Sequence, residues 1–187
     1  MERFWRHGFY ASSIEDLVAA TGLTRAALYA EFGDKAGLFR ASLALYSQEV
    51  VAPLQAPMES NPGGLTDLKK YFDTQIARAE RAGLPGPGCL MANTMVECST
   101  IECGPHDESF SAVVSQHLKR TMEAFRLALQ YESLQRTGRR LPEVERLAWY
   151  LTISAQGLWS VSRVVSDAKV LRAYAEDLFR QVERRLS

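Results

Sequence analysis

The chain has 187 residues, of which 47% are hydrophobic, and this suits one or two compact units with a buried core. Lys and Arg total 22, as do Asp and Glu, so the formal net charge is zero. No apolar run is long enough for a membrane span, and the charged N-terminus MERFWRHGF lacks the apolar core of a signal peptide. The three cysteines, an odd number, argue against a disulfide framework and favour a reducing, cytoplasmic location.

Residues 12–40, SSIEDLVAATGLTRAALYAEFGDKAGLFR, predict two short helices around a tight turn, followed at once by a third helix. Ser12 is predicted to cap the first helix, with Glu15 completing a capping box. Gly22 is predicted to end that helix, and Thr24 to cap the next one. Gly33 is then predicted to end the second helix and Asp34 to cap the third. This arrangement is typical of a helix-turn-helix DNA-binding domain, although a generic bundle of short helices is the alternative.

The second helix of this segment presents an outward face with small and polar side chains. The small residues would let the helix enter a major groove, Arg25 could reach a guanine edge or a phosphate, and the Tyr29 hydroxyl suits a phosphate. Lys35 opens the third helix, where its ammonium and the backbone N–H groups both favour an anion. The predicted DNA contacts are Ser12, Ser13, Thr24, Arg25, Ala26, Tyr29, Ala30 and Lys35.

Charge gives no further support for DNA binding, because residues 1–50 hold five basic and six acidic side chains. A nucleic-acid binder usually has a basic footprint. The prediction of DNA binding therefore depends on the helix pattern and not on charge. We expect modest non-specific affinity for DNA.

The same segment resembles the DNA-binding domain of the TetR family of bacterial transcriptional repressors. The residues that carry the resemblance are Gly8-Phe9, Ser12-Ser13-Ile14, Asp16-Leu17, Ala20, Gly22, Thr24, Leu28-Tyr29, Phe32, Lys35 and Leu38. It implies a homodimer that binds a palindromic double-stranded DNA operator and is released by a small-molecule effector. Because the family's first helix usually begins further upstream, the first helix here is expected to be truncated or very short.

The rest of the chain predicts helices and no strands, so the expected fold class is all-α. We expect a three-helix helix-turn-helix domain at 1–46 and a helical effector-binding and dimerisation domain at 47–187. A break after a connecting helix is predicted at Pro53, Pro57, Asn61, Pro62 and Gly63-Gly64. The predicted helices are 35–52, 65–82, 89–102, 108–135, 142–165 and 167–186, with Asp167 as the cap of the last one.

The last two predicted helices carry apolar residues at coiled-coil spacing. Two such helices from each protomer would form a four-helix bundle, and a dimer suits a palindromic site. The alternative is that these residues form only the intramolecular core. The predicted dimer residues are Leu151, Ala155, Leu158, Leu171, Ala175, Leu178 and Val182.

A mostly apolar effector pocket with a few orienting polar groups is predicted between the helices of 65–165. Most of the aromatic and sulfur side chains in this range are also expected to be core. The candidate lining residues are Met91, Asn93, Thr94, Glu97, Phe110, His117, Met122, Tyr150, Gln156 and Trp159.

Cys89 is predicted to be the most reactive of the three thiols, because a helix N-terminus lowers a thiol pKa and the preceding Gly/Pro loop is expected to be mobile and wet. The alternative is a small packed hydrophobe, as for Cys98. Cys103 and His106 stand near Cys98, but no second paired motif accompanies them, so we expect neither metal nor cofactor. No enzyme signature is present. The competing hypothesis is a ligand-binding or thiol-based redox-sensing protein with weak or lost DNA binding, and a small helical enzyme is a third.

Overall fold

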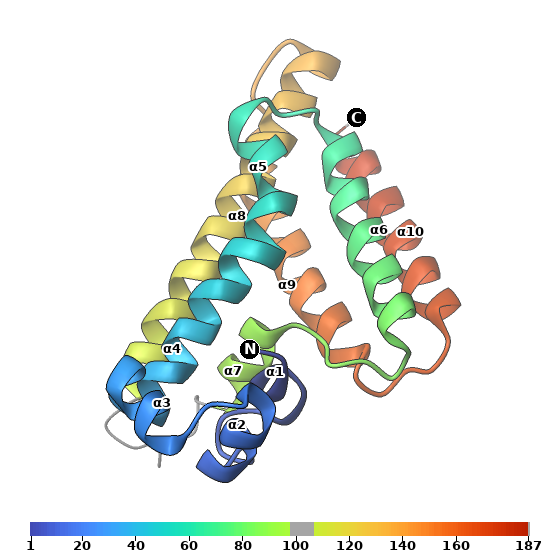
Figure 1. Ribbon diagram of the computed structural model, residues 1–187. Helices are drawn as coiled ribbons and strands as arrows, with labels where there is room; N and C mark the ends of the chain where they lie inside the picture. Colours follow the sequence, from blue (N-terminus) through green and yellow to red (C-terminus); the bar gives the residue numbers. More distant parts are fainter. Residues whose placement is uncertain (98–106, 187) are drawn as a thin grey trace. The chain divides into compact units, whose positions relative to one another are not determined.

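The computed structural model describes residues 1–97 and 107–186, and in these ranges every regular element is a helix (Figure 1). The all-α fold class expected from the sequence is therefore confirmed. The helices divide into two compact units, which are described separately. Unit 1 comprises Met1–Val51 and Cys89–His117, and unit 2 comprises Ala52–Gly88 and Leu118–Ser187.

Unit 1 is built around a cluster of phenylalanine rings. Phe39 lies 4.9 Å from Phe4 and 4.9 Å from Phe110 between ring centroids, both in edge-to-face arrangements, and Phe9 lies 5.2 Å from Phe110. Such contacts add to the free energy gained from burying the rings. The helices of unit 1 are α1 (Glu2–His7), α2 (Ile14–Thr21), α3 (Arg25–Phe32), α4 (Lys35–Tyr46), the π-helical turn η1 (Ser47–Val51), α7 (Leu90–Glu97) and the first part of α8 (Asp107–Thr137).

Helix α7 belongs to unit 1 although it is far from the other N-terminal helices in sequence. It contacts α1 and α4, and its first turn buries Leu90, Met91 and Ala92. A segment outside residues 1–46 therefore contributes to the packing of the N-terminal helices.

The predicted break is right in its second half only. The connecting helix does not end near residue 52, because α4 is followed without a gap by η1 and then by α5 (Ala52–Ser60), which contains Pro57. The chain leaves the helix at 61–64, where the predicted Asn61, Pro62 and Gly63-Gly64 lie. The π-helical turn ends at Val51, two residues before Pro53, which lacks the N–H that a regular helix would use there. Neither Pro53 nor Pro57 ends the helix.

Unit 2 consists of α5, α6 (Leu65–Ala82), the remainder of α8, α9 (Val144–Val161) and α10 (Ala168–Arg185). Helices α6 and α10 pack side by side (Figure 1). Phe72 of α6 is the centre of their core, 5.3 Å from Phe179, 6.2 Å from Phe125 and 6.0 Å from Trp159 between ring centroids. Asp167 caps α10 as predicted, accepting a hydrogen bond from the Lys169 N–H.

The apolar stripe predicted as the dimer seam is the intramolecular core of unit 2. All seven of its residues are buried within the single chain, with exposed fractions of 5% or less. The coiled-coil spacing identifies the buried face of α9 and α10 correctly, but helices of the same chain cover that face. The assignment to an intermolecular surface is therefore corrected to the alternative of internal packing.

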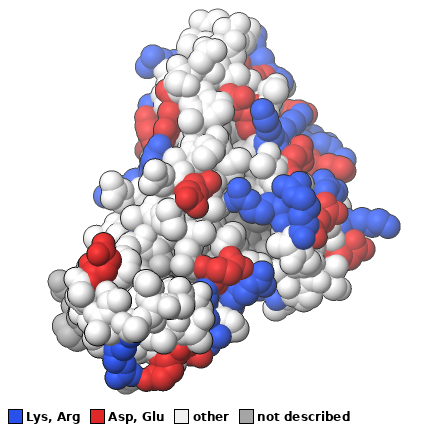
Figure 2. All heavy atoms as spheres, viewed as in Figure 1, with Lys and Arg blue, Asp and Glu red and all other residues white. Residues whose placement is uncertain are grey.

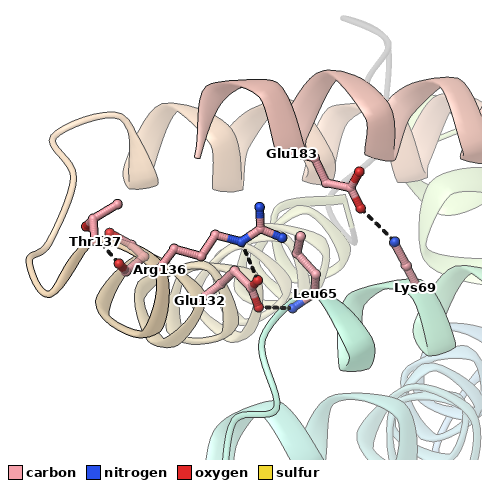
Figure 3. Close-up of polar contacts among 7 residues, drawn as sticks. Leu65, Lys69, Glu132, Arg136, Thr137 and Glu183 are labelled. Carbon is pink, nitrogen blue, oxygen red and sulfur yellow. Dashed lines mark hydrogen bonds and ion pairs between the residues drawn. The ribbon is translucent and has the colours of Figure 1, made fainter. Parts of the chain in front are cut away.

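A carboxylate fixes the start of α6. Glu132 of α8 accepts a hydrogen bond from the Leu65 N–H at 3.0 Å and another from the Arg136 guanidinium at 2.6 Å (Figure 3). Burial alone would raise the pKa of Glu132, but these donors together hold that pKa below its ordinary value. A second contact, Lys69 with Glu183 at 2.7 Å, joins α6 to α10 in the same view.

Candidate nucleic-acid interface

The start of α2 is fixed by a capping box that lies one residue later than predicted. Ser13 is the N-cap, its hydroxyl accepts from the Asp16 N–H at 3.1 Å, and Asp16 accepts from the Ser13 N–H at 2.9 Å. The Ser13 backbone N–H is the main cause of the lowered pKa of Asp16. Ser12, the predicted cap and DNA contact, is fully buried, and its hydroxyl donates to the Gly8 carbonyl at 2.7 Å. Ser12 is therefore unavailable to a ligand.

The turn between α2 and α3 has the predicted geometry. Gly22 adopts the left-handed conformation with φ of 69°, which ends α2. Thr24 caps α3 by accepting from the Ala27 N–H at 3.2 Å. Leu28 is 3% exposed and anchors α3 to the core of unit 1. The short helices α2 and α3 are thus joined by a tight turn, and α3 is anchored to the core on the side of Leu28.

The opposite side of α3 is open. Arg25, Ala26, Tyr29 and Ala30 are all exposed, as predicted, together with the cap residue Thr24. The Arg25 guanidinium forms an ion pair with Glu15 of α2. An exposed pair of this kind contributes only about 0–1 kcal/mol, so it can exchange for a contact to a phosphate or a base.

Lys35 lies at the start of α4, beside this surface. Asp34 caps the helix by accepting from the Gly37 N–H at 2.6 Å, as predicted. The Lys35 ammonium is half-buried and lies 4.5 Å from the centroid of the Phe9 ring. Burial lowers the pKa of Lys35, and the Glu97 carboxylate partly opposes this shift. The Lys35 ammonium therefore interacts with the Phe9 ring and with the Glu97 carboxylate, both in unit 1.

The predicted effector-pocket residues are divided between the two units. Phe110 belongs to the phenylalanine cluster of unit 1, and the Thr94 hydroxyl donates to the Leu90 carbonyl at 2.8 Å. Gln156 and Trp159 are buried in unit 2, where Gln156 Nε2 and Trp159 Nε1 have no hydrogen-bond partner among the described residues. The candidates in unit 1 are Met91, Asn93, Thr94, Glu97, Phe110 and His117, and those in unit 2 are Met122, Tyr150, Gln156 and Trp159.

Glu97 has a contact that sequence reasoning missed. Its two carboxylate oxygens accept from the backbone N–H groups of Phe9 and Tyr10, at 2.9 and 2.8 Å, in the turn between α1 and α2. The only sequence signal was that Glu97 is polar in a mostly apolar helix. That pattern cannot distinguish a pocket group from a group that binds backbone.

Cys89 does not have the accessible environment that was predicted. It is 4% exposed, and burial raises the pKa of its thiol, although hydrogen bonds from Tyr46 and from α7 backbone groups oppose the shift. Burial thus opposes the lowered pKa that was predicted from the helix start, and the ranking of the three thiols stays a prediction. Cys98, Cys103 and His106 lie outside the described residues.

A charged hollow of about 390 Å³ lies between α6 and α10 in unit 2. Side chains of both signs gather over these two helices, as Figure 2 shows. None of the predicted effector-pocket residues lines this hollow. Its lining is Lys69, Asp73, Arg172, Ala175, Glu176, Phe179, Arg180 and Glu183. In the described ranges no helix has the length and apolar composition needed to cross a membrane.

Together the capped turn, the core-anchored α3 and its open outer face define a helix-turn-helix domain. Residues 1–42 match the model of the bacterial regulatory proteins of the tetR family. The chain belongs to the TetR family.

Two curated relatives and one solved structure are similar to the chain beyond the N-terminal helices. The chain is 33% identical to the HTH-type transcriptional repressor ComR of Escherichia coli (strain K12) over 127 residues, which is 67% of this chain and 59% of ComR. It is 24% identical over 182 residues to the uncharacterized HTH-type transcriptional regulator YezE of Bacillus subtilis (strain 168), covering 94% of this chain and 88% of YezE. A cysteine mutant of the TetR family regulator CifR, solved in complex with 26-bp operator DNA, has the same fold with a TM-score of 0.78 and 22% identity, over 95% of this chain and 90% of that one.

Proposed function

We propose that this protein is a transcriptional regulator that binds operator DNA through the exposed face of α3. The observation that carries the proposal is the open surface of Thr24, Arg25, Ala26, Tyr29 and Ala30 on a helix whose opposite side is anchored by a buried leucine. The relatives support it, since ComR is named a repressor and the CifR mutant was solved on operator DNA. Such a regulator would work in the cytoplasm, where bacterial DNA lies.

The proposed contacts follow from what each side chain can reach. Arg25 would leave its exposed partner Glu15 for a guanine edge or a phosphate, and Tyr29 would donate to a phosphate. Ser13, at the start of α2, and Lys35, at the start of α4, would bind phosphates beside backbone N–H groups. The buried Ser12 is left out of this set. Because the surface has few cations, we expect base contacts and dimerisation, which doubles the number of contacts, to supply most of the affinity for DNA.

We also propose that the protein acts as a homodimer through an exposed apolar stripe on α9, α10 and the connection between them. Ile153 of α9 is 67% exposed and Val164 of the connection is 77% exposed, and apolar residues that gather into an exposed patch mark interaction sites. Gly157, between them, has open space where a Cβ would lie, so a partner helix can approach closely. The stripe consists of Trp149, Ile153, Val161, Val164, Val170 and Tyr174. A dimer of this kind matches the two-fold symmetry of a palindromic operator.

A small-molecule effector that releases a repressor from DNA is the third part of the proposal. Gln156 and Trp159 support it, because two buried N–H donors without partners on one helix could orient an acceptor on a mostly apolar compound. The effector would have to favour a state that binds DNA poorly, with a difference in affinity of about 1–3 kcal/mol. A thermal-shift screen of small molecules, followed by DNA binding with each hit, tests this coupling.

The alternative is a ligand-binding or redox-sensing protein that has lost DNA binding. The neutral charge of the chain favours it, whereas the burial of Cys89 removes one of its candidate sensors. Selection of duplexes from a random DNA library, followed by a gel-shift assay of the selected duplex, separates the two. Enrichment of a palindromic sequence supports the regulator, and the absence of any enrichment would overturn it.

A further inference from the structure

The turn between α1 and α2 is held by a carboxylate from a distant part of the chain. Glu97, at the end of α7, accepts from the Phe9 N–H at 2.9 Å through one oxygen and from the Tyr10 N–H at 2.8 Å through the other. Hydrogen bonds with an ionised acceptor are roughly twice as strong as neutral ones. One side chain therefore fixes two successive backbone groups just before the capping box of α2.

The turn is shaped to receive this carboxylate. Gly8 has φ of +80°, and a Cβ on it would lie 2.7 Å from a carboxylate oxygen of Glu97. Glycine at this position thus serves both the backbone conformation and the close approach of Glu97. Asn93, one turn earlier on α7, directs its amide nitrogen to the Trp5 carbonyl of α1 at 3.4 Å. Two polar residues on one face of α7 therefore bind backbone groups of the N-terminal segment.

Phe9 connects this tether to the proposed phosphate contact. Its backbone is bound by Glu97, and its ring lies under the Lys35 ammonium at 4.5 Å. Phe9 is 8% exposed and packs 5.1 Å from the Phe39 ring of α4, so it has little freedom to move alone. A displacement of the turn would be transmitted directly to Lys35.

We propose that Glu97 is a positioning residue for DNA recognition. It acts through the turn of Gly8 to Tyr10, which sets the start of α2 and the place of the Lys35 ammonium. This inference rests on the proposed function, because it requires that α3 and Lys35 bind DNA. It also makes α7, and not only the helix-turn-helix itself, part of what determines operator affinity.

Glu97→Gln tests this role, because simple electrostatics and positioning predict opposite signs. Loss of a negative charge near the DNA surface would by itself strengthen binding. Loss of the bidentate acceptor leaves one N–H facing an amide NH₂, which loosens the turn and lowers the fraction of binding-competent protein. We expect operator affinity to fall about tenfold, measured with the duplex that the wild-type protein selects from a random library.

Glu132→Gln is the matched control, since Glu132 also accepts from a backbone N–H after a glycine but lies in unit 2. We expect it to change operator affinity by less than about twofold. Equal affinities for wild type and Glu97→Gln would overturn the positioning role alone. Failure of the wild type to select any duplex would overturn the proposed function and this role together. Should Glu97→Gln not fold, Glu97→Asp keeps the charge but shortens the reach, and unchanged affinity there overturns the role as well.

A double-mutant cycle distinguishes positioning from general stabilisation. If Glu97 acts by placing Lys35, Glu97→Gln costs less affinity when Lys35→Ala is already present. We expect the tenfold loss to shrink to about threefold in that background. Strictly additive losses would show that Glu97 does not act through Lys35 and would overturn the proposed pathway.

Discussion

Arg25→Ala separates the contribution of one side chain to DNA binding from its contribution to folding. In the free protein Arg25 forms an ion pair with Glu15, and the two side chains are 56% and 71% exposed. Such a pair contributes at most about 1 kcal/mol to stability, so the melting temperature should hardly change. If Arg25 reads a base edge, its loss costs about 1–3 kcal/mol of specific binding, which is about 5- to 150-fold in Kd.

Fluorescence anisotropy with the selected duplex measures this loss, and a thermal melt measures the stability. Arg180→Ala is the matched control, because Arg180 forms a similarly exposed pair with Asp177 in unit 2 and carries the same charge. Glu15→Gln should strengthen binding, since it frees the guanidinium and removes a charge that repels phosphate. Equal operator affinity for the Arg25 and Arg180 variants would refute the assignment of Arg25 to the interface.

Three further predictions concern phosphate binding, assembly and acid stability. Lys35→Ala should weaken binding to all duplexes alike and lower the salt slope by about one ion; a loss confined to one sequence would mean that Lys35 reads bases. The wild type should have a mass of twice 20.9 kDa by light scattering, and Ile153→Glu should reduce it to that of one chain. Leu45→Glu, at an exposed site on α4, should leave the mass unchanged. An unchanged mass for Ile153→Glu would contradict the proposed stripe. The pKa of Glu132 in the folded state lies below its ordinary value near 4.5, so the unfolded chain binds more protons between the two values. The stability that Glu132 supplies is therefore present above about pH 4.5 and is lost as the pH falls through the folded-state pKa, and the difference in Tm between wild type and Glu132→Gln should narrow on acidification. If the difference in Tm between wild type and Glu132→Gln did not change with pH, the Glu132 carboxylate would not stabilise the fold through its charge.

The local sequence by itself determined the elements of the helix-turn-helix. Thr24 and Asp34 cap their helices as predicted, because such a cap is a hydrogen bond between a side chain and a backbone N–H three residues away. Gly22 ends α2 as predicted, because glycine readily adopts the left-handed conformation. The exposed face of α3 followed from the same local geometry, since the position of buried Leu28 fixes which side chains point outward. The all-α class followed from helical spacing along the whole chain.

Only the tertiary structure decided what covers each apolar face and what each polar group binds. The spacing on α10 marks Leu171, Ala175 and Leu178 as buried, but burial by the same chain and by a partner have the same sequence pattern. Cys89 opens a helix, yet desolvation sets its pKa, and desolvation depends on the neighbours that fold around it. Glu97 binds backbone groups almost ninety positions away in the chain, a contact that no local pattern encodes.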